Sequence, residues 1–288
     1  MRFTKMQGAG NDFVMLDATQ EPFTLTTEQI RALCDRRYGV GCDQLLVVEK
    51  SALPEVDFKY RIFNCSGGEV EMCGNGARCF AVFVRELGLT DKTTIACETV
   101  KGVIRPHMED DGTVTVDMGR PRFEAADVGL VTQGLETKTE GEATLYKIAA
   151  SGLDNWVSIV SMGNPHAVMF IDEHPKDFDL EKYGKACEGN TNVFPDRVNA
   201  EFAKIIDRNN IEMRVYERGS GETLACGTGS CATAVAAITL GLCDNDVTIH
   251  LLGGDLDISW SGDVNDSVFM TGPAKEVFTG EVDLNKFD

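Results

Sequence analysis

The 288-residue sequence predicts an α+β protein of two pseudo-symmetric domains, each a curled mixed or antiparallel sheet around a central apolar helix. Three observations support this: a long internal repeat, many short strand-like segments in each copy, and one helix-length stretch per copy that is apolar nearly all round. A helix without a polar face has to be buried on every side, as it is when a sheet curls about it. A repeat this long indicates two domains rather than a solenoid, whose units have about 20–50 residues.

The repeat is clearest around two cysteines, Cys73 and Cys226, which lie 153 positions apart (226 − 73). Each follows a Gly-Glu pair by four or five positions and opens a Cys-Gly-x-Gly turn. Further pairs share the offset or slip to 152, and a nearly constant offset over most of the chain indicates a duplicated unit. These pairs are Gly10-Asn11 with Gly163-Asn164, Arg61–Asn64 with Arg214–Glu217, Cys34 with Cys187, Leu87–Leu89 with Leu240–Leu242, and Val116–Pro121 with Val268–Pro273.

In the first unit, residues 2–17 alternate as a strand broken by a turn at 8–11. The pair Thr26 and Gln29 forms a capping-box pattern, which predicts a helix over 27–36. An apolar helix is expected over 77–87, ended by Gly88 in the C′ position. Strands are expected at 45–48, 58–63, 93–97, 103–105 and 113–116.

The second unit begins within residues 119–145, a stretch rich in Gly, Pro and Glu, and repeats this plan. Helices are expected at 180–187 and 230–240, and strands at 156–170, 211–216, 247–252, 256–260 and 268–270. The expected domains are residues 1–122 together with 272–288, which carry Cys73, and residues 123–271, which carry Cys226.

Charge and hydropathy exclude several classes of partner. The net charge is −19 and no Lys/Arg cluster is present, so we expect neither nucleic acid nor a membrane as partner. The N-terminus lacks the apolar core of a signal peptide. The longest run of low polarity, residues 232–242, is too short to span a bilayer. We therefore expect a cytoplasmic protein.

The ten cysteines predict neither a disulfide framework nor a metal site. The cytosol keeps thiols reduced. No Cys-x-x-Cys occurs, and the close pairs Cys73/Cys79 and Cys226/Cys231 differ in spacing and have no histidine nearby. Most of the others are expected to be small buried apolar residues, namely Cys34, Cys79, Cys97, Cys187, Cys231 and Cys243.

Each Cys-Gly-x-Gly turn is suited to hold a carboxylate beside a reactive thiol. The first amides of a helix have no partner within the helix, and glycine lets an anion approach them. A substrate carboxylate is therefore expected on the amides of Gly74, Asn75, Gly227 and Thr228. The same helix dipole is expected to lower the pKa of each cysteine.

Two such turns facing each other would place one α-carbon between two sulfurs. A thiolate would remove the α-proton and a thiol would return a proton to the opposite face, which inverts the carbon. Helix-start donors would stabilise the enediolate by roughly 3–4 kcal/mol each, and closure of the domains would exclude water. One Cys-Gly-x-Gly alone is most simply a structural turn, but two in register before apolar helices favour a catalytic pair.

The chain resembles the diaminopimelate epimerase family over essentially its whole length. The resemblance lies in the segments Gly10–Phe13, Asp43–Leu46, Asn64, Cys73–Arg78, Gly163–His166, Arg197–Asn199, Tyr216–Gly219, Gly221–Thr223 and Ala225–Gly229. It implies an isomerase without cofactor, independent of pyridoxal phosphate, that interconverts LL- and meso-2,6-diaminopimelate for lysine and peptidoglycan-precursor biosynthesis. It also implies the family's fold, a small-molecule substrate and a homodimer.

Position by position, the resemblance implies that Cys73 and Cys226 are the catalytic acid and base, whose roles exchange with reaction direction. It implies that His166 and Glu217 modulate the pKa of the thiols. The guanidinium of Arg218 suits the distal carboxylate, because it can bind both oxygens. The implied substrate-binding residues are Asn11, Gln44, Asn64, Gly74, Asn75, Asn164, Asn199, Glu217, Arg218, Gly227 and Thr228.

Three places depart from the family pattern. Cys65, with Ser66 and Gly67, adds a thiol after Asn64, where a more ordinary polar loop is expected. Residues 200–202 differ slightly from the expected continuation. Phe269 stands where a tyrosine is expected at a dimer contact.

Three other interpretations compete with the epimerase. A proline or hydroxyproline racemase-type enzyme would share the fold and two cysteines, but would have His where Asn75 stands and Asp ahead of the second cysteine. A cysteine-based redox or metal-binding protein would hold zinc or a Cys73–Cys226 disulfide. A non-catalytic amino-acid binder would need neither thiol.

Overall fold

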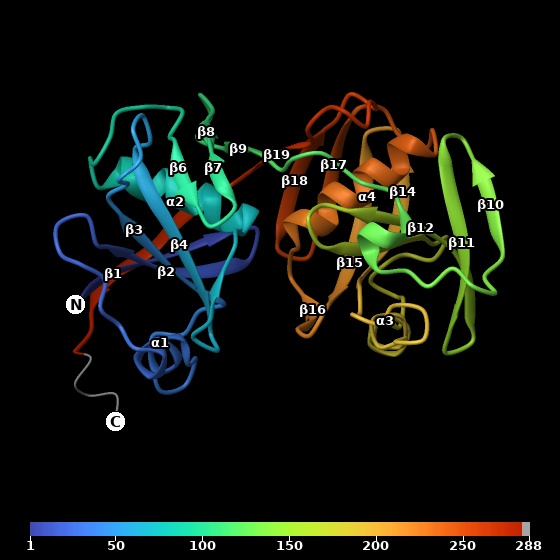
Figure 1. Ribbon diagram of the computed structural model, residues 1–288, viewed down its shortest axis with the longest axis horizontal. Coiled ribbons are helices and arrows are strands. Elements are labelled where there is room, and N and C mark those ends of the chain that lie inside the picture. Colours follow the sequence, from blue (N-terminus) through green and yellow to red (C-terminus); the bar gives the residue numbers. More distant parts are fainter. Residues whose placement is uncertain (284–288) are drawn as a thin grey trace. The chain divides into compact units, whose positions relative to one another are not determined.

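The computed structural model describes residues 1–283 and divides the chain into two units, each α+β (Figure 1). Unit 1 comprises residues 1–117 and the segment from Thr271 onward, and unit 2 comprises residues 118–270. The chain passes between them at 117/118 and 270/271, where the sequence analysis placed the boundaries at 122/123 and 271/272. The C-terminal segment thus belongs with the N-terminal unit.

The sheet of unit 1 is built on a β-hairpin at its N-terminus. In spatial order its strands are β20 (Lys275–Glu281), β1 (Arg2–Gly8), β2 (Asn11–Asp17), β3 (Gln44–Glu49), β4 (Phe58–Asn64), β6 (Cys97–Thr99) and β7 (Gly102–Ile104), with β5 (Glu69–Val70) on β4. A hairpin of β8 (His107–Met108) and β9 (Val114–Asp117) follows in the chain.

Unit 2 contains the corresponding sheet with one more strand, β10, at one edge. The spatial order is β10 (Thr137–Glu140), β11 (Ala143–Ala150), β12 (Leu153–Ser161), β13 (Pro165–Phe170), β14 (Asn199–Asp207), β15 (Asn210–Glu217), β17 (Asp246–Leu251) and β18 (Gly254–Ser259), with β16 (Gly221–Thr223) on β15. A 3-10 turn, η1 (Ala125–Val128), precedes them, and β19 (Phe269–Gly272) follows.

The two sheets repeat the same sequence of strand directions. From β1 to β7 the successive pairs are antiparallel, parallel, antiparallel, parallel and antiparallel. From β12 to β18 the successive pairs have the same five directions. This pairing confirms the duplication, and β20 beside β1 takes the place that β11 takes beside β12.

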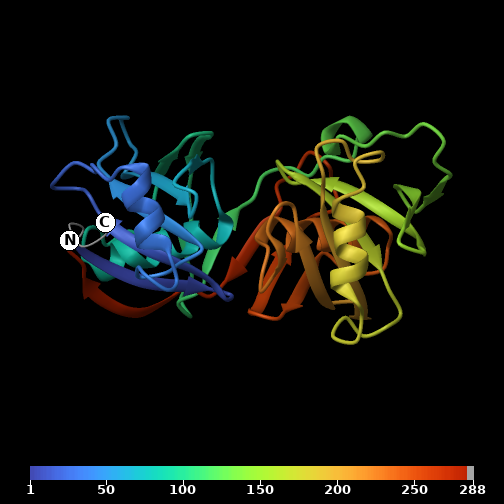
Figure 2. The same ribbon diagram turned by 90° about the horizontal axis from the view of Figure 1, so that it is seen from below.

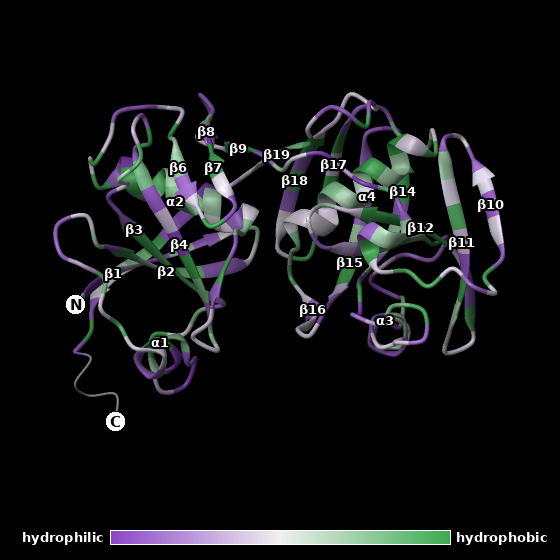
Figure 3. Cartoon of the chain, viewed as in Figure 1, coloured by the Kyte–Doolittle hydropathy of each residue, from purple (hydrophilic) through white to green (hydrophobic). Residues whose placement is uncertain are grey.

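Each sheet curls about one buried helix and carries a second helix on its outer face. The central helices are α2 (Gly74–Glu86) and α4 (Gly227–Thr239), and every residue of α2 from Gly74 to Val84 is buried. The outer helices are α1 (Thr27–Cys34) and α3 (Leu180–Glu188), each across the outside of its own sheet (Figure 2). Central strands such as β2 and β3 have four consecutive buried apolar residues, as strands covered on both faces require, and hydrophobic stretches run through both units (Figure 3).

Several elements differ from the sequence-based expectation. The helices expected at 77–87 and 230–240 begin three residues earlier, directly after Cys73 and Cys226. The single strand expected at 156–170 is a hairpin, β12 and β13, because Gly163 adopts positive φ and turns the chain. The strand expected at 93–97 has only an isolated bridge at Thr94 before β6 begins. The missed strands include β10, β11, β14 and β20.

The predicted capping box at the start of α1 is confirmed. The Thr26 side chain accepts from the Gln29 amide, and the Gln29 side chain accepts from the Thr26 amide. All six cysteines expected to be buried are buried. Among residues 1–283, no helix has the length and apolar character needed to cross a membrane.

Candidate active site

Cys73 and Cys226 hold the same position in the two units, as the N-cap residues of the central helices. Their backbone is extended in both cases, with φ of −129° and −128°. The first amides of each helix therefore belong to Gly74 and Asn75 in α2 and to Gly227 and Thr228 in α4. Helix-start amides point out of the helix and attract anions, so each unit has a helix start of the kind that can bind a carboxylate.

The second glycine of each Cys-Gly-x-Gly motif is required by close packing. A Cβ on Gly76 would lie 2.8 Å from the Tyr60 hydroxyl, and a Cβ on Gly229 would lie 2.8 Å from Glu201 Oε1. Real Cβ atoms do not approach heavy atoms this closely, so each glycine lets the first helical turn lie against the sheet beneath it. The repeated motif therefore reflects packing of the helix start.

The unit-1 half-site comprises Asn11, Gln44, Asn64, Cys73, Gly74 and Asn75. Asn11 Oδ1 lies 3.6 Å from Cys73 Sγ and 3.5 Å from Asn75 Nδ2. Gln44 Nε2 donates to Asn64 Oδ1 at 2.9 Å. Asn75 is buried, and within the described chain its Oδ1 atom has no hydrogen-bond partner. An acceptor left open beside a helix start is suited to a ligand ammonium group.

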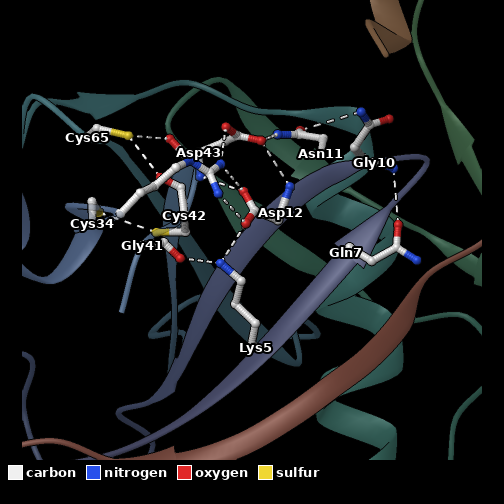
Figure 4. Close-up of polar contacts among 12 residues, drawn as sticks. Lys5, Gln7, Gly10, Asn11, Asp12, Cys34, Gly41, Cys42, Asp43 and Cys65 are labelled. Atoms are coloured by element: carbon white, nitrogen blue, oxygen red, sulfur yellow. Dashed lines mark hydrogen bonds and ion pairs between the residues drawn. The ribbon is translucent and has the colours of Figure 1, made fainter. Parts of the chain in front are cut away.

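A charged network fixes the orientation of Asn11 (Figure 4). Asn11 Nδ2 donates to Asp43 Oδ2 at 2.8 Å, which leaves Oδ1 directed at Cys73 and Asn75. Arg36 bridges both carboxylates, with contacts of 2.6 Å to Asp12 and 2.7 Å to Asp43. Burial alone would raise the pKa of Asp12, but hydrogen bonds from Arg36 and Lys5 lower it to about 2.

The unit-2 half-site comprises Asn164, His166, Asn199, Glu217, Arg218, Cys226, Gly227 and Thr228. Asn164 Nδ2 donates to Thr228 Oγ1 at 3.2 Å, and Thr228 Oγ1 lies 3.5 Å from Cys226 Sγ. Asn199 ties two strands to the site, because its Oδ1 accepts from the Arg218 amide and its Nδ2 donates to the Pro165 carbonyl, both at 2.9 Å. The Gly229 amide donates to Cys226 Sγ at 3.4 Å.

His166 lies beneath this half-site in a buried pair with Glu201. Its Nδ1 atom is 2.6 Å from Glu201 Oε1, and neither side chain is exposed. Its Nε2 atom is 3.0 Å from Asn164 Oδ1. Both ring nitrogens thus lie within hydrogen-bond distance of a side-chain oxygen. His166 therefore sets the orientation of Asn164, as Asp43 does for Asn11.

The expected lowering of the cysteine pKa at the helix start is wrong for Cys226. Burial raises the pKa of Cys226 well above its ordinary value, and the negative charges of Glu217 and Glu201 add to this. The Gly229 amide and the Thr228 hydroxyl act in the opposite direction but are outweighed. Burial likewise raises the pKa of Glu217, against hydrogen bonds from Thr223 and Cys226. The neutral thiol is therefore the favoured form of Cys226 at neutral pH.

Within each unit the structure brings several of the predicted site residues into contact and adds three neighbours that the sequence analysis missed. Glu201 contacts His166, Asp43 holds Asn11, and the Tyr60 hydroxyl lies 3.3 Å from the Cys73 carbonyl. For Glu201 the usable signal was a charged residue flanked by the apolar residues Ala200, Phe202 and Ala203. The first five residues of β14 are all buried, and Glu201 is fully buried among them.

Two cavities in unit 2 lie apart from these residues. One, of about 200 Å³, is lined by residues that include His174, Glu212 and His250, and the other, of about 610 Å³, includes Trp260 and Phe269. No predicted site residue lines either cavity. Within residues 1–283, no three His, Cys, Asp or Glu side chains are grouped so as to hold a metal ion.

Comparison with known proteins gives one consistent family. The family model described as diaminopimelate epimerase matches residues 3–124 and 158–277. A diaminopimelate epimerase of Ralstonia pickettii is 54% identical over 285 residues, covering 99% of this chain and 97% of the relative.

Solved structures with much lower sequence identity show the same fold. A PhzF-family phenazine biosynthesis protein of Bacillus anthracis has a TM-score of 0.69 at 17% identity and covers 98% of each chain. A probable proline racemase from Agrobacterium radiobacter has a TM-score of 0.70 at 14% identity, covering 100% of this chain and 94% of its own. At this identity the likeness extends to the fold alone and does not favour a racemase over an epimerase.

Proposed function

Because the chain belongs to the diaminopimelate epimerase family, we propose that Cys73 and Cys226 are the acid–base pair with which this isomerase interconverts LL- and meso-diaminopimelate. The observation that carries the proposal is the equivalence of the two thiols. Each is the N-cap of the central helix in its copy of a duplicated unit, beside the free amides of that helix start. Inversion at carbon requires proton transfer on two opposite faces, and a duplicated thiol site supplies one group for each face.

The helix starts hold the reacting carboxylate in this mechanism. The amides of Gly74, Asn75, Gly227 and Thr228 donate to its oxygens as negative charge builds on the enediolate. Such preorganised donors contribute roughly 3–4 kcal/mol each to barrier lowering. The open Oδ1 of Asn75 accepts a hydrogen bond from the α-ammonium group.

The distal end of the substrate is recognised by the remaining polar side chains. The exposed guanidinium of Arg218 binds the distal carboxylate through two nitrogens. The amides of Asn11, Gln44, Asn64, Asn164 and Asn199 hold the other polar groups. Because Asp43 and His166 fix the orientation of Asn11 and Asn164, these two ligands are positioned before the substrate binds.

The surroundings of Cys226 support a proton-donating role for it in one reaction direction. Its raised pKa keeps the thiol protonated, ready to deliver a proton to the carbanion. In this direction Cys73 is the base that first removes the α-proton. The two roles exchange in the reverse direction. Besides burial, Glu217 and Glu201 raise the pKa of Cys226, His166 acts on it through Glu217, and Glu201 holds His166 in place.

We further propose that the enzyme is a cytoplasmic homodimer that acts on this small molecule, without cofactor, metal, nucleic acid or membrane as partner. Family resemblance supports the dimer, and Phe269, at the family's dimer position, is 44% exposed. An exposed aromatic side chain at this position is suited to a contact with a second copy. Light scattering should show a dimer that Phe269→Arg weakens.

The function is tested by isotope exchange with the solvent. Epimerisation of LL-diaminopimelate in heavy water should give meso product with one deuterium at the inverted carbon, because a thiol exchanges its proton with solvent. Product free of solvent label would rule out proton transfer by two thiols. Proline offered as substrate under the same conditions should show no exchange, since the amide and guanidinium ligands have no distal group to bind.

A further inference from the structure

Three cysteines that take no part in the proposed mechanism lie together in unit 1. They are Cys34, the last residue of α1, Cys42, just before β3, and Cys65, just after β4, and together they form the thiol cluster (Figure 4). Cys42 Sγ lies 3.4 Å from Cys34 Sγ. Cys65 Sγ lies 3.0 Å from the Cys42 carbonyl oxygen and 2.9 Å from that of Asp43. Only Cys65 is exposed, whereas the other two are buried.

The backbone around the cluster holds the three thiols in place. Arg31 of α1 donates to the Ser66 carbonyl at 2.6 Å, which ties the turn after Cys65 to this helix. A Cβ on Gly67 would lie 2.5 Å from Thr27 Cγ2, so the turn rests directly on the start of α1. The Cys42 amide donates to the Cys34 carbonyl at 3.2 Å. The proximity of the thiols is therefore a property of the fold and does not depend on side-chain rotation alone.

We propose that Cys65 is a modification site for hydroperoxides and that Cys34 converts the first product into a Cys34–Cys65 disulfide. In the first step the Cys65 thiolate attacks the peroxide, a sulfur–oxygen bond forms, and the oxygen–oxygen bond breaks to release water or an alcohol. Sulfur is oxidised to the sulfenic acid and the peroxide is reduced. In the second step the Cys34 sulfur attacks that sulfur, the sulfur–oxygen bond breaks, and the displaced oxygen leaves as water with the proton of Cys34.

The electrostatics of the cluster assign different roles to the two sulfurs. A hydrogen bond from the Cys34 thiol, supported by the charge of Arg36, lowers the pKa of Cys65 to about 7 against the effect of burial. The lowered pKa makes the Cys65 thiolate more accessible at neutral pH than that of an ordinary cysteine, and the thiolate is the form that reacts with peroxides. Contact with Cys42 and Cys65, together with burial, raises the pKa of Cys34. Cys34 thus stays protonated, as suits a thiol that donates to the thiolate and reacts only after Cys65 is oxidised.

Oxidation of Cys65 to the disulfide should weaken substrate binding. This effect rests on the proposed roles of Gln44 and Asn64 as substrate ligands. Cys65 directly follows Asn64, and its sulfur contacts the carbonyls of the two residues before Gln44. A bond to Cys34 draws the sulfur away from those carbonyls and shifts both ends of the hydrogen bond between Gln44 and Asn64. The oxidised enzyme should therefore show a higher KM with a smaller change in kcat, reversed by dithiothreitol.

The modification is tested by peptide mapping, which does not depend on turnover. The reduced full-length protein is treated with increasing hydrogen peroxide, free thiols are alkylated, and the digested peptides are identified by mass spectrometry. The Cys34–Cys65 cross-link should appear at lower peroxide than oxidation of Cys97 or Cys243. In Cys34→Ala, dimedone should label Cys65 as the trapped sulfenic acid.

A matched control comes from the internal repeat. Cys187 of α3 corresponds to Cys34 of α1, but the residue corresponding to Cys65 is Arg218, so Cys187→Ala should leave the cross-link unchanged. Cys65→Ser keeps a hydroxyl that can donate to the same carbonyls. This variant should not form the cross-link, and its activity under reducing conditions should differ from that of the wild type by less than about twofold.

Either of two results would overturn the proposal: Cys65 oxidising no faster than Cys243, or a Cys34–Cys42 bond that forms equally well in Cys65→Ser. The cross-link can form in Cys73→Ala/Cys226→Ala, which has no proposed catalytic thiol. A cross-link in this double variant, together with no isotope exchange in the wild-type enzyme, would refute only the proposed function. Isotope exchange in the wild-type enzyme, together with no cross-link in the double variant, would refute only the modification site.

Discussion

The half-sites of units 1 and 2 share a backbone but differ in the residues that lie under the cysteine-bearing helix. In the paired strands β2 and β3, Phe13 is opposite Gln44, and in β13 and β14 His166 is opposite Asn199. Two positions further along each pair, Leu46 of unit 1 corresponds to Glu201 of unit 2. A buried apolar pair thus occupies, in unit 1, the place of the hydrogen-bonded His166–Glu201 pair.

The charged residues of unit 1, Asp12 and Asp43, stand one position before Phe13 and Gln44. They therefore face the other side of the sheet. Asp12 and Asp43 pair with Arg36 and Lys5, and successive strand residues face opposite sides. Their counterparts in unit 2 are Pro165 and Val198. The two units therefore share the helix start and its thiol, but their titratable groups lie on opposite sides of the sheet. The comparison indicates that protonation is tuned beneath Cys226, whereas Asn11 at Cys73 is held by charges from the α1 side.

The largest expected effect concerns the shared feature, the two thiols. Cys73→Ala and Cys226→Ala should each lower the epimerisation rate by roughly 10³-fold, because each removes the group that transfers a proton on one face. Cys79→Ala and Cys231→Ala are matched controls, since these buried thiols lie in the same two helices. Near-normal turnover in either of the first two variants would remove that cysteine from the mechanism.

Replacing the buried pair of His166 and Glu201 by apolar residues tests the difference between the units directly. Glu201→Leu alone should destabilise the protein by about 3–5 kcal/mol, because it leaves His166 buried without its partner. The double variant His166→Phe/Glu201→Leu copies unit 1 and should recover most of that loss, as apolar replacements of buried ion pairs often do. Urea unfolding measures the recovery, and both variants should have strongly reduced turnover. A fully active double variant would show that the pair has no part in catalysis.

The charged network of unit 1 should make stability depend on pH. The pKa of Asp12 falls from 3.8 to about 2 in the folded protein. A lowered folded pKa stabilises above the unfolded value, here by about 2 kcal/mol, and this stability is lost as the pH falls from about 4 through about 2. Asp12→Asn should therefore be less stable than wild type at pH 7, and the gap should narrow in acid. Asp154→Asn, at an exposed ion pair with Lys147 in unit 2, should leave the same unfolding curve nearly unchanged.

The smallest expected effect is the loss of stability on removing the N-caps of the two outer helices. Thr26→Ala removes one half of a reciprocal capping box on α1 and should cost about 1 kcal/mol. Asp179 caps α3 by a single bond from the Lys182 amide, without the return bond that Gln29 makes. The double variant Thr26→Ala/Gln29→Ala should therefore destabilise more than Asp179→Ala in urea unfolding. Equal losses would mean that the return bond contributes nothing.

Much of this molecule could be predicted from the sequence because its strongest signals are local or periodic. The constant offset predicted a duplicated α+β fold, the absence of a polar face predicted buried central helices, and the capping box at Thr26 predicted the start of α1. The residues placed in each half-site come from short motifs whose members lie close together once the duplicated sheets form. The strands β10 and β20 were missed because they lie at the edges of their sheets, where nearly all of their residues are exposed and no apolar pattern is needed.

By itself the sequence determined the duplicated fold, the family and the two cysteines, since repetition and motif spacing are written along the chain. Only the tertiary structure decided which groups surround each thiol. Strand pairing brings Glu201 to His166 and Asp43 to Asn11, and the packing of α1 against the turn at Cys65 assembles the thiol cluster. The physical reason is that burial and charge at a site come from residues distant along the chain. These contacts reversed the expected lowering of the pKa at Cys226.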